Sequence, residues 1–359
     1  MKNILKRTIT LLICVCLVLS FAGCHKPGEL AVTVGDEEFS SGFYACAFLS
    51  ASVTAQNRVY DETGNTSISD KELFAKTIDG TPYAEWVKKQ ALEICKQMVA
   101  AKQLCEQNTV DTAKYIESAK TTAESEWKAN TEYFEKNGIG LESYKKFCAY
   151  EQYSNAYFDY LYGEGGPEEV TDDVLNKYIT DNYVYVNAID ADVTKMDETK
   201  LAEQEKKFNG YIDRIKKGES FAKIYSEVME STYTEDTTDD GTFSNTYGIV
   251  WGNKDTSYES DYFDKVKEME QNSFKIITDD TTVQGYKYMI LIYKGNILSE
   301  KNTNLETIKG VALSDMKGDE FTEKLNKQTQ SVTAVENEKS TKQFKVDKVY
   351  LPDTSNYYY

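Results

Sequence analysis

Apolar residues recur at helical spacing through most of residues 29–162, and this pattern predicts a largely helical region. The region opens instead with alternating residues 31–39, where Gly35 and Asp36 supply the turn of a β-hairpin. The clearest apolar stripe, at residues 86–105, predicts a long amphipathic helix. The polar residues 61–79 indicate a surface insertion. Further helices are expected at residues 41–51, 111–133 and 141–162.

The second half of the chain mixes helical and strand patterns after a linker. Residues 163–167 (GEGGP) combine three glycines with a proline, which is typical of a linker. Residues 288–293 (YMILIY) are continuously apolar, which indicates a central strand of a sheet. After about residue 305, the pattern predicts one amphipathic helix and a closing strand at residues 344–351. Other expected elements are a strand at residues 183–186 and helices at 200–215 and 220–228.

The first 24 residues have the pattern of an export signal. Three basic residues precede an uncharged apolar run at residues 9–21, and two small residues then lead into Cys24. The run is shorter than the roughly 20 apolar residues that span a membrane, which favours a secretory signal peptide. Residues 21–24 (FAGC) resemble the lipobox of bacterial lipoproteins, with Phe21 where leucine is usual, so we expect a lipid on Cys24. An ordinary signal peptide with an incidental cysteine, or an uncleaved anchor, is the alternative.

Charge narrows the range of partners. The chain carries 41 basic and 59 acidic residues, and removal of three basic leader residues takes the net charge from −18 to −21. So negative a surface repels phosphates and anionic lipid head groups, which argues against nucleic acid as a partner.

No run of residues after the signal peptide is apolar enough to span a membrane. The remaining length of about 335 residues suggests two or three domains.

The histidine content excludes histidine-dependent nucleophilic catalysis and zinc sites, whereas the cysteines are informative only at the proposed anchor. His25 is the only histidine and directly follows Cys24, so neither a Ser-His-Asp triad nor a histidine-containing zinc site can form inside the fold. No phosphate-binding glycine motif is present, and no cofactor or metal is expected. After removal of the signal peptide, four cysteines remain besides Cys24, and they are expected to be free or structural thiols, although an exported location would permit disulfides among them. These are Cys46, Cys95, Cys105 and Cys148.

Short motifs, in a consistent order along the chain, resemble the SurA/PrsA group of extracytoplasmic foldases. The opening hairpin resembles that of the group, and residues 91–107 look like the helix that follows it. Residues 170–174 resemble the entry to a parvulin-type isomerase domain. Residues 215–222 are the nearest match to a parvulin segment, with Gly218 at the end of one helix. The matching stretches read VTVGDEEFS, ALEICKQMVAAKQLCEQ, NGIGLESY, VTDDV and IKKGESFA.

The resemblance implies an α+β fold that covers almost the whole mature chain. A helical chaperone lobe, completed by a C-terminal helix and strand, would accompany a parvulin-like α/β domain with a small, mostly antiparallel sheet. The expected limits are residues 1–23 for the signal peptide, 24–162 for the helical lobe, 163–169 for the linker, 170–298 for the parvulin-like domain and 299–359 for a C-terminal segment that packs back on the lobe.

The parvulin resemblance lacks the two histidines of active isomerases. The matching runs here are residues 186–189 (VNAI) and 285–289 (GYKYM), and the glycine-rich loop of the family is reduced. Lys287 is a strongly hydrated cation and a poor replacement for a neutral imidazole. We therefore expect weak or absent prolyl isomerase activity and assign no catalytic residue. Phe243, Lys287 and Met289 are the residues expected to line what remains of the groove.

These patterns together favour a chaperone or foldase anchored to the outer face of the cell membrane through Cys24. Its expected partners are unfolded or newly exported polypeptides, the membrane through the N-terminal lipid and, in a homodimer, a second copy of the chain. The first alternative is an active peptidyl-prolyl isomerase of parvulin type. The second is a non-catalytic lipoprotein that binds one dedicated envelope partner.

Overall fold

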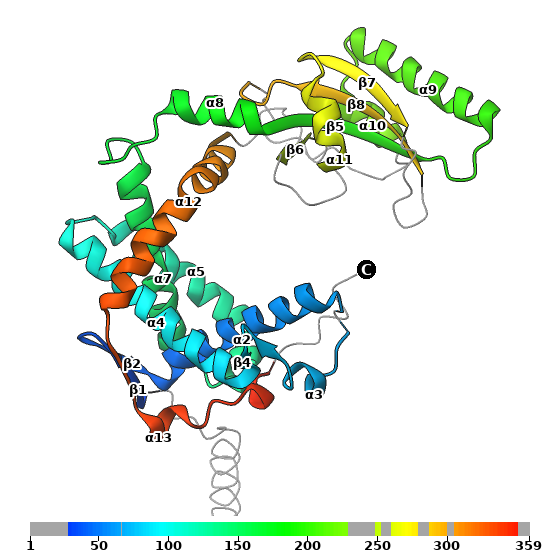
Figure 1. Cartoon of the computed structure of the whole chain (residues 1–359). Coiled ribbons are helices and arrows are strands. Elements are labelled where there is room, and N and C mark those ends of the chain that lie inside the picture. Colours follow the sequence, from blue (N-terminus) through cyan, green and yellow to red (C-terminus); the bar gives the residue numbers. More distant parts are fainter. Residues whose placement is uncertain are drawn as a thin grey trace, which may run out of the picture. The chain divides into compact units, whose positions relative to one another are not determined.

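The computed structural model describes residues 28–65, 67–228, 248–252, 260–278, 287–299 and 305–350. The described chain forms two compact units (Figure 1). The first combines the chain up to Glu169 with the chain from Asp319 onward, and the second is Val170–Gly318. Helices dominate the first unit, and helices cover an antiparallel sheet in the second, so the predicted α+β class is confirmed.

Three long helices pack on one another and form the body of the helical unit. α2 (Ser41–Thr63) packs on α4 (Tyr83–Gln107), and both contact α7 (Leu141–Tyr162). The first of them begins after Ser40, whose side chain accepts a hydrogen bond from the amide of Phe43 at 3.3 Å. The fourth long helix, α5, packs on α7. The helices are α2 (Ser41–Thr63), α3 (Asp70–Leu73), α4 (Tyr83–Gln107), α5 (Ala113–Ala129), α6 (Thr131–Lys136), α7 (Leu141–Tyr162), α13 (Glu338–Thr341) and the second half of α12 (Leu305–Ser331).

A three-stranded antiparallel sheet joins the two ends of the chain within this unit. β1 (Leu30–Val34) lies between β2 (Glu37–Ser40) and β9 (Ala334–Glu336). Gly35 turns β1 into β2 with a φ of 56°, a left-handed value that glycine adopts without strain. Its amide donates a hydrogen bond of 2.8 Å to the carbonyl of Thr333, just before β9. The predicted hairpin is confirmed, and a second short hairpin, β3 (Thr77–Ile78) with β4 (Thr81–Pro82), precedes α4.

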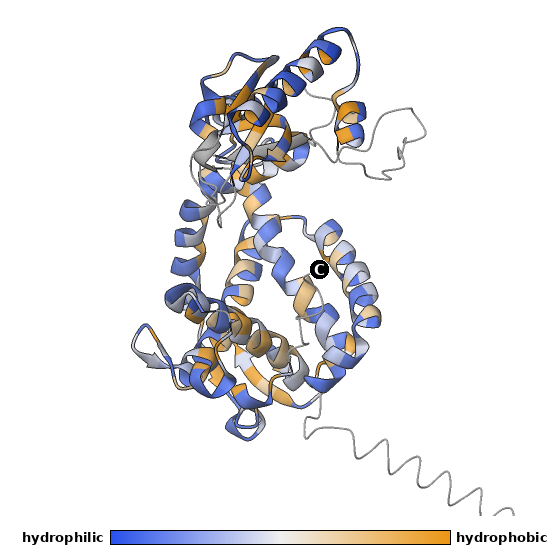
Figure 2. Cartoon of the chain, turned by 90° about the vertical axis from the view of Figure 1, so that its right-hand side faces the viewer, coloured by the Kyte–Doolittle hydropathy of each residue, from blue (hydrophilic) through white to orange (hydrophobic). Residues whose placement is uncertain are grey.

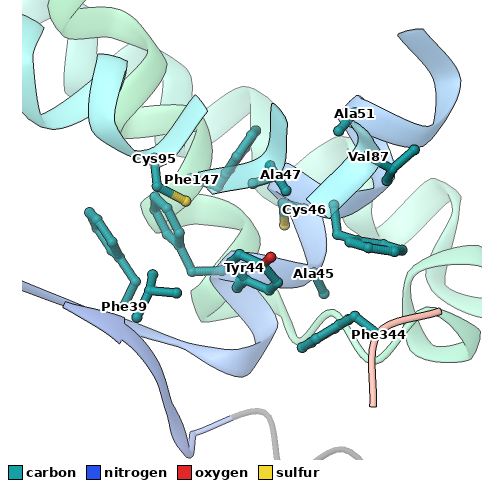
Figure 3. Packing of buried hydrophobic residues seen from close by; sticks show 14 of the residues in the cluster. Phe39, Tyr44, Ala45, Cys46, Ala47, Ala51, Val87, Cys95, Phe147 and Phe344 are labelled. Carbon is teal, nitrogen blue, oxygen red and sulfur yellow. The ribbon is translucent and has the colours of Figure 1, made fainter. Parts of the chain in front are cut away.

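Aromatic side chains from both ends of the chain fill the core of the helical unit (Figure 3). The rings of Phe39 and Phe43 stack with centroids 4.0 Å apart, and Phe147 of α7 meets Phe43 edge-on at 5.3 Å. Phe344, from the C-terminal segment, packs edge-on against Tyr44 at 5.1 Å and is 4% exposed. The C-terminal segment therefore belongs to the same core as α2.

The second unit contains a four-stranded sheet in the order β6-β5-β8-β7, with antiparallel pairing throughout. β8 lies between β5 and β7, which confirms the predicted central strand at residues 288–293. The elements of this unit are α8 (Asp172–Asn182), β5 (Tyr183–Asp192), α9 (Glu198–Lys216), α10 (Phe221–Val228), β6 (Gly248–Gly252), α11 (Ser260–Lys267), β7 (Ser273–Thr278), β8 (Tyr288–Gly295) and the first half of α12.

Both faces of this sheet are covered, because successive side chains of a strand point to opposite faces. Ile290 and Ile292 of β8 pack on one face with Phe263 of α11. Met289 and Leu291 pack on the other face with α9 and α10. Figure 2 shows the corresponding hydropathy, with hydrophobic residues gathered on the strands and on the packed sides of the helices. The continuous apolar run of β8 follows from burial on both faces.

Three sequence predictions are corrected. The helix expected at residues 41–51 continues to Thr63. The stretch at residues 61–79 is not only a surface insertion, since it contributes Leu73 and Ile78 to the core. The closing strand expected from residue 344 is wrong, because Phe344 packs into the core and a short 3-10 helix follows it at Val346–Lys348. The strand of this segment is β9, which occupies the edge of β1 that β2 leaves open.

Candidate functional site

A cavity of about 520 Å³ lies between α5 and α7 on the helical unit. Both helices contribute side chains at intervals of three and four residues, which places each set on one helical face. The lining from α5 is Lys114, Tyr115, Ser118, Ala119, Thr122, Ala123 and Glu126, and that from α7 is Tyr144, Cys148, Glu151 and Gln152.

The cavity exists because α5 presents small side chains where α7 presents larger ones. Ala119, Thr122 and Ala123 lie at the centre of the α5 lining, and their short side chains leave space between the two helices. Ala123 is also buried, at 1% exposure, and α5 remains packed against α7 there. The cavity is thus an open depression with a packed floor.

Carboxylates give the cavity a negative character. The hydroxyl of Tyr144 donates a hydrogen bond of 2.7 Å to Glu126, which orients that carboxylate from across the cavity. Desolvation raises the pKa of Glu151, and the nearby negative charge of Glu126 raises it further. Within the described residues, no hydrogen bond or ion pair engages the Glu151 carboxylate. Two like charges therefore face one space without a cation between them.

Tyr115 and Lys114 lie together at the other end of the lining. The hydroxyl of Tyr115 donates a hydrogen bond of 2.5 Å to Asp159 of α7. The ammonium of Lys114 lies 4.7 Å from the centroid of the Tyr115 ring, a cation–π distance. Lys114 is the one basic residue of the lining, and it stands beside the tyrosine rather than beside either glutamate.

Cys148 is the only described cysteine that reaches the cavity. Its side chain is half-buried, and burial raises the pKa of its thiol to about 11, so little thiolate is present at neutral pH. Cys46, Cys95 and Cys105 are buried and also free. The prediction of free or structural thiols is therefore confirmed for these four cysteines.

A second polar network connects α7 with the opening hairpin. The hydroxyl of Tyr150 donates a hydrogen bond of 2.7 Å to Glu37, and Lys102 of α4 forms an ion pair with Glu37 at 3.0 Å. The ammonium of Lys146 lies 4.9 Å from the centroid of the Phe39 ring. These contacts connect α4, α7 and β2, which is a structural role.

The residues predicted from the parvulin resemblance are not assembled into a groove by the described chain. Met289 is 3% exposed and packs in the core with α9 and α10. Lys287 is exposed, and its backbone amide donates a hydrogen bond of 2.8 Å to the hydroxyl of Thr194. Phe243 and Cys24 lie outside the described residues. The residual groove and the lipid on Cys24 stay predictions.

The cavity residues were missed at the sequence level. The stripe of small residues on α5 and the spacing of Tyr144, Cys148 and Glu151 are visible in the sequence. What the sequence did not show is that these two faces lie opposite each other.

Among the described residues, no group of three or more metal-ligating side chains could hold a metal ion. No helix of the described chain is both long and apolar enough to cross a membrane.

No protein-family model matches the chain, and no curated protein matches it in sequence. Solved structures of foldases do match. The foldase protein PrsA of Streptococcus pneumoniae is 17% identical over 68% of this chain and 84% of its own, with a TM-score of 0.36. PrsA of Lactococcus lactis is 13% identical over 89% of this chain and 100% of its own, with a TM-score of 0.35. PrsA of Bacillus subtilis is 16% identical over 76% of this chain and 90% of its own, with a TM-score of 0.28.

Proposed function

We propose that this chain is a membrane-anchored extracytoplasmic chaperone that binds newly exported polypeptides in unfolded form. The observation that carries the proposal is the order of the foldase-like motifs together with the elements on which they fall. A helical unit is built from both ends of the chain, and an α/β unit is inserted between them in sequence. That is the arrangement that the motif order implies.

Each motif coincides with the kind of element that the resemblance requires. VTVGDEEFS forms the β1–β2 hairpin, and residues 91–107 lie in α4. Gly218 of the IKKGESFA motif ends α9 with a φ of 96°, and α10 begins at Phe221. The corner is held by the Arg214 guanidinium, which donates hydrogen bonds to Glu219 at 2.7 and 2.9 Å. This agreement between local sequence and local structure supports the foldase interpretation.

The proposed activity is holding rather than isomerisation. Accelerating rotation about an X-Pro bond requires polar groups fixed around the twisted amide. The position that matches the second parvulin histidine is Lys287, which is exposed and hydrated. The open cavity between α5 and α7 instead offers tyrosine rings and polar groups, a surface suited to varied polypeptides.

The test measures whether the chain from Gly28 onward, which contains every described element, suppresses the aggregation of another protein. A chemically denatured, unrelated client protein is diluted into buffer with and without this chain, and light scattering is followed. We expect scattering to fall as the chain is added in molar excess. An equally acidic, unrelated protein serves as the control for a general charge effect. Scattering that is unchanged, or lowered equally by the control protein, would contradict the proposal.

Anchoring is tested separately on the full chain. The Cys24→Ala variant should appear in the culture medium, while the unchanged chain stays with the membrane fraction, because a lipid is the proposed tether. Membrane retention of the Cys24→Ala variant would overturn the lipoprotein assignment and leave the chaperone proposal standing.

A further inference from the structure

The cavity between α5 and α7 has a charge arrangement that lacks its complement. Glu126 and Glu151 face the same space, and their negative charges are close enough to affect each other. Tyr144 donates one hydrogen bond to Glu126, but no described cation pairs with either carboxylate. A positively charged group bound in the cavity would remove this repulsion, and the Tyr144 ring of the lining would add cation–π attraction.

We infer that this cavity binds the cationic side chain of a lysine or arginine in a bound polypeptide. The inference rests on the proposed chaperone function, since the polypeptide is its client. Glu126 and Glu151 would accept hydrogen bonds from the ammonium or guanidinium group, and the wall of Tyr144 would contact the aliphatic stem.

The shape and chemistry of the cavity favour a side chain over other occupants. A metal ion needs several converging ligands, and the described residues contain no group of three or more that could hold one. An anion would meet two carboxylates. An uncharged apolar side chain would desolvate Glu151 without pairing it, which is unfavourable. A long cationic side chain pairs with the carboxylates, and the cavity of about 520 Å³ has room for it.

The experiment compares matched fluorescent peptides by anisotropy, with the chain from Gly28 onward. The peptides share an extended Gly/Ser framework and differ only at one set of positions, which hold lysine, arginine or glutamine. We expect the lysine and arginine peptides to bind more tightly than the glutamine peptide. The Glu126→Gln and Glu151→Gln variants should each raise the dissociation constant for lysine peptide about fivefold, the equivalent of an ion pair worth about 1 kcal/mol.

A matched control separates the cavity from the overall negative charge. Glu117 of α5 and Glu142 of α7 lie on the same two helices but outside the lining, and the Glu142 side chain is 87% exposed. The double variant Glu117→Gln/Glu142→Gln removes the same charge as Glu126→Gln/Glu151→Gln. We expect the control to leave affinity for the lysine peptide within twofold of the unchanged chain. Circular dichroism confirms that all variants are folded.

Cys148 supplies a direct readout of occupancy. It lines the cavity, whereas Cys46, Cys95 and Cys105 are at most 5% exposed. Saturating lysine peptide should slow alkylation of Cys148 severalfold, and the glutamine peptide at the same concentration should not.

The inference is overturned by equal binding of the lysine and glutamine peptides, or by equal weakening of binding in the cavity and control double variants. Unchanged alkylation of Cys148 under saturating lysine peptide also overturns it. If aggregation is still suppressed in any of these cases, the chaperone proposal stands and only the cationic site fails. If lysine peptide protects Cys148 but no client is held in solution, the cavity assignment stands and the chaperone function fails.

Discussion

Replacing Phe344 by alanine tests whether the C-terminal segment completes the core of the helical unit. The ring is 4% exposed, and its centroid lies 5.1 Å from that of Tyr44 and 5.7 Å from that of Phe48. Truncating a buried phenylalanine to alanine costs about 3–5 kcal/mol, and the cost is smaller where neighbours can collapse into the space. Because Phe344 lies in a short segment without regular strand pairing, we expect the lower value, about 3 kcal/mol.

Urea denaturation followed by tryptophan fluorescence measures this loss in the correct unit. Trp86 and Trp127 belong to the helical unit and Trp251 to the other, so a Trp251→Phe background confines the signal to the helical unit. The slope of unfolding free energy with urea is about 1–3 kcal/mol per molar. A loss of about 3 kcal/mol therefore lowers the midpoint by about 1–3 M.

The variant Phe344→Leu is the matched control, because it keeps most of the apolar volume and should cost about 1.5 kcal/mol or less. An unchanged midpoint for Phe344→Ala would show that the segment after α12 adds nothing to the core. Equal losses for alanine and leucine would show that burial of the ring is not the source of the stability.

Three further predictions concern the α9–α10 corner, acid stability and isomerisation. Gly218→Ala should destabilise the second unit by about 1 kcal/mol in thermal unfolding, because the φ of 96° at residue 218 strains any L side chain. The control Gly210→Ala, inside α9, should stabilise the same unit. A stabilising effect of Gly218→Ala would contradict the reasoning. Burial alone would raise the pKa of Glu37, but hydrogen bonds from Tyr150 and Lys102 hold it below its usual value of 4.5. The Glu37 carboxylate therefore stabilises the helical unit above pH 4.5, and this stabilisation is lost as the pH falls. The urea midpoints of the unchanged chain and of Glu37→Gln should differ at pH 7 and converge in acid. A difference that stays constant with pH would refute this. In a protease-coupled assay, a prolyl peptide should isomerise no faster than without the chain, and acceleration would favour the isomerase alternative.

Local patterns in this sequence predict those elements whose formation depends on neighbouring residues. Gly35 and Asp36 between alternating residues were enough for the β1–β2 hairpin, and helical spacing placed α7 at residues 141–162. The apolar run at residues 288–293 indicated burial on both faces, and β8 indeed lies between two strands with helices on either side. In each case the residues that determine the element lie within one turn or one strand of each other.

Features that depend on distant partners could not be predicted in this way. β9 is three residues long and exists because β1 has an open edge some 300 residues earlier in the chain. The alternation after residue 344 is typical of a strand, but the Phe344 ring gains more by packing against Tyr44 than the segment would gain from a strand without a partner. Tertiary packing overrides local preference at such positions.

The candidate site likewise combines features that are visible in the local sequence with a long-range contact that is not. The small face of α5 and the spacing of Tyr144 and Glu151 on α7 are legible in the sequence, but neither face indicates what lies opposite. The pairing of Glu126 with Tyr144 across the cavity is a long-range contact between helices. In so acidic a chain, these two glutamates do not stand out from the other acidic residues.

The most direct measurement of the chaperone proposal is the affinity of the chain for one protein in two states. A small basic protein is reduced and carbamidomethylated so that it cannot refold, and its binding is compared with that of its native form by fluorescence anisotropy. We predict saturable binding of the unfolded form and no detectable binding of the native form at the same concentrations. Equal binding of both forms, or binding of neither, would contradict a function in holding unfolded exported polypeptides.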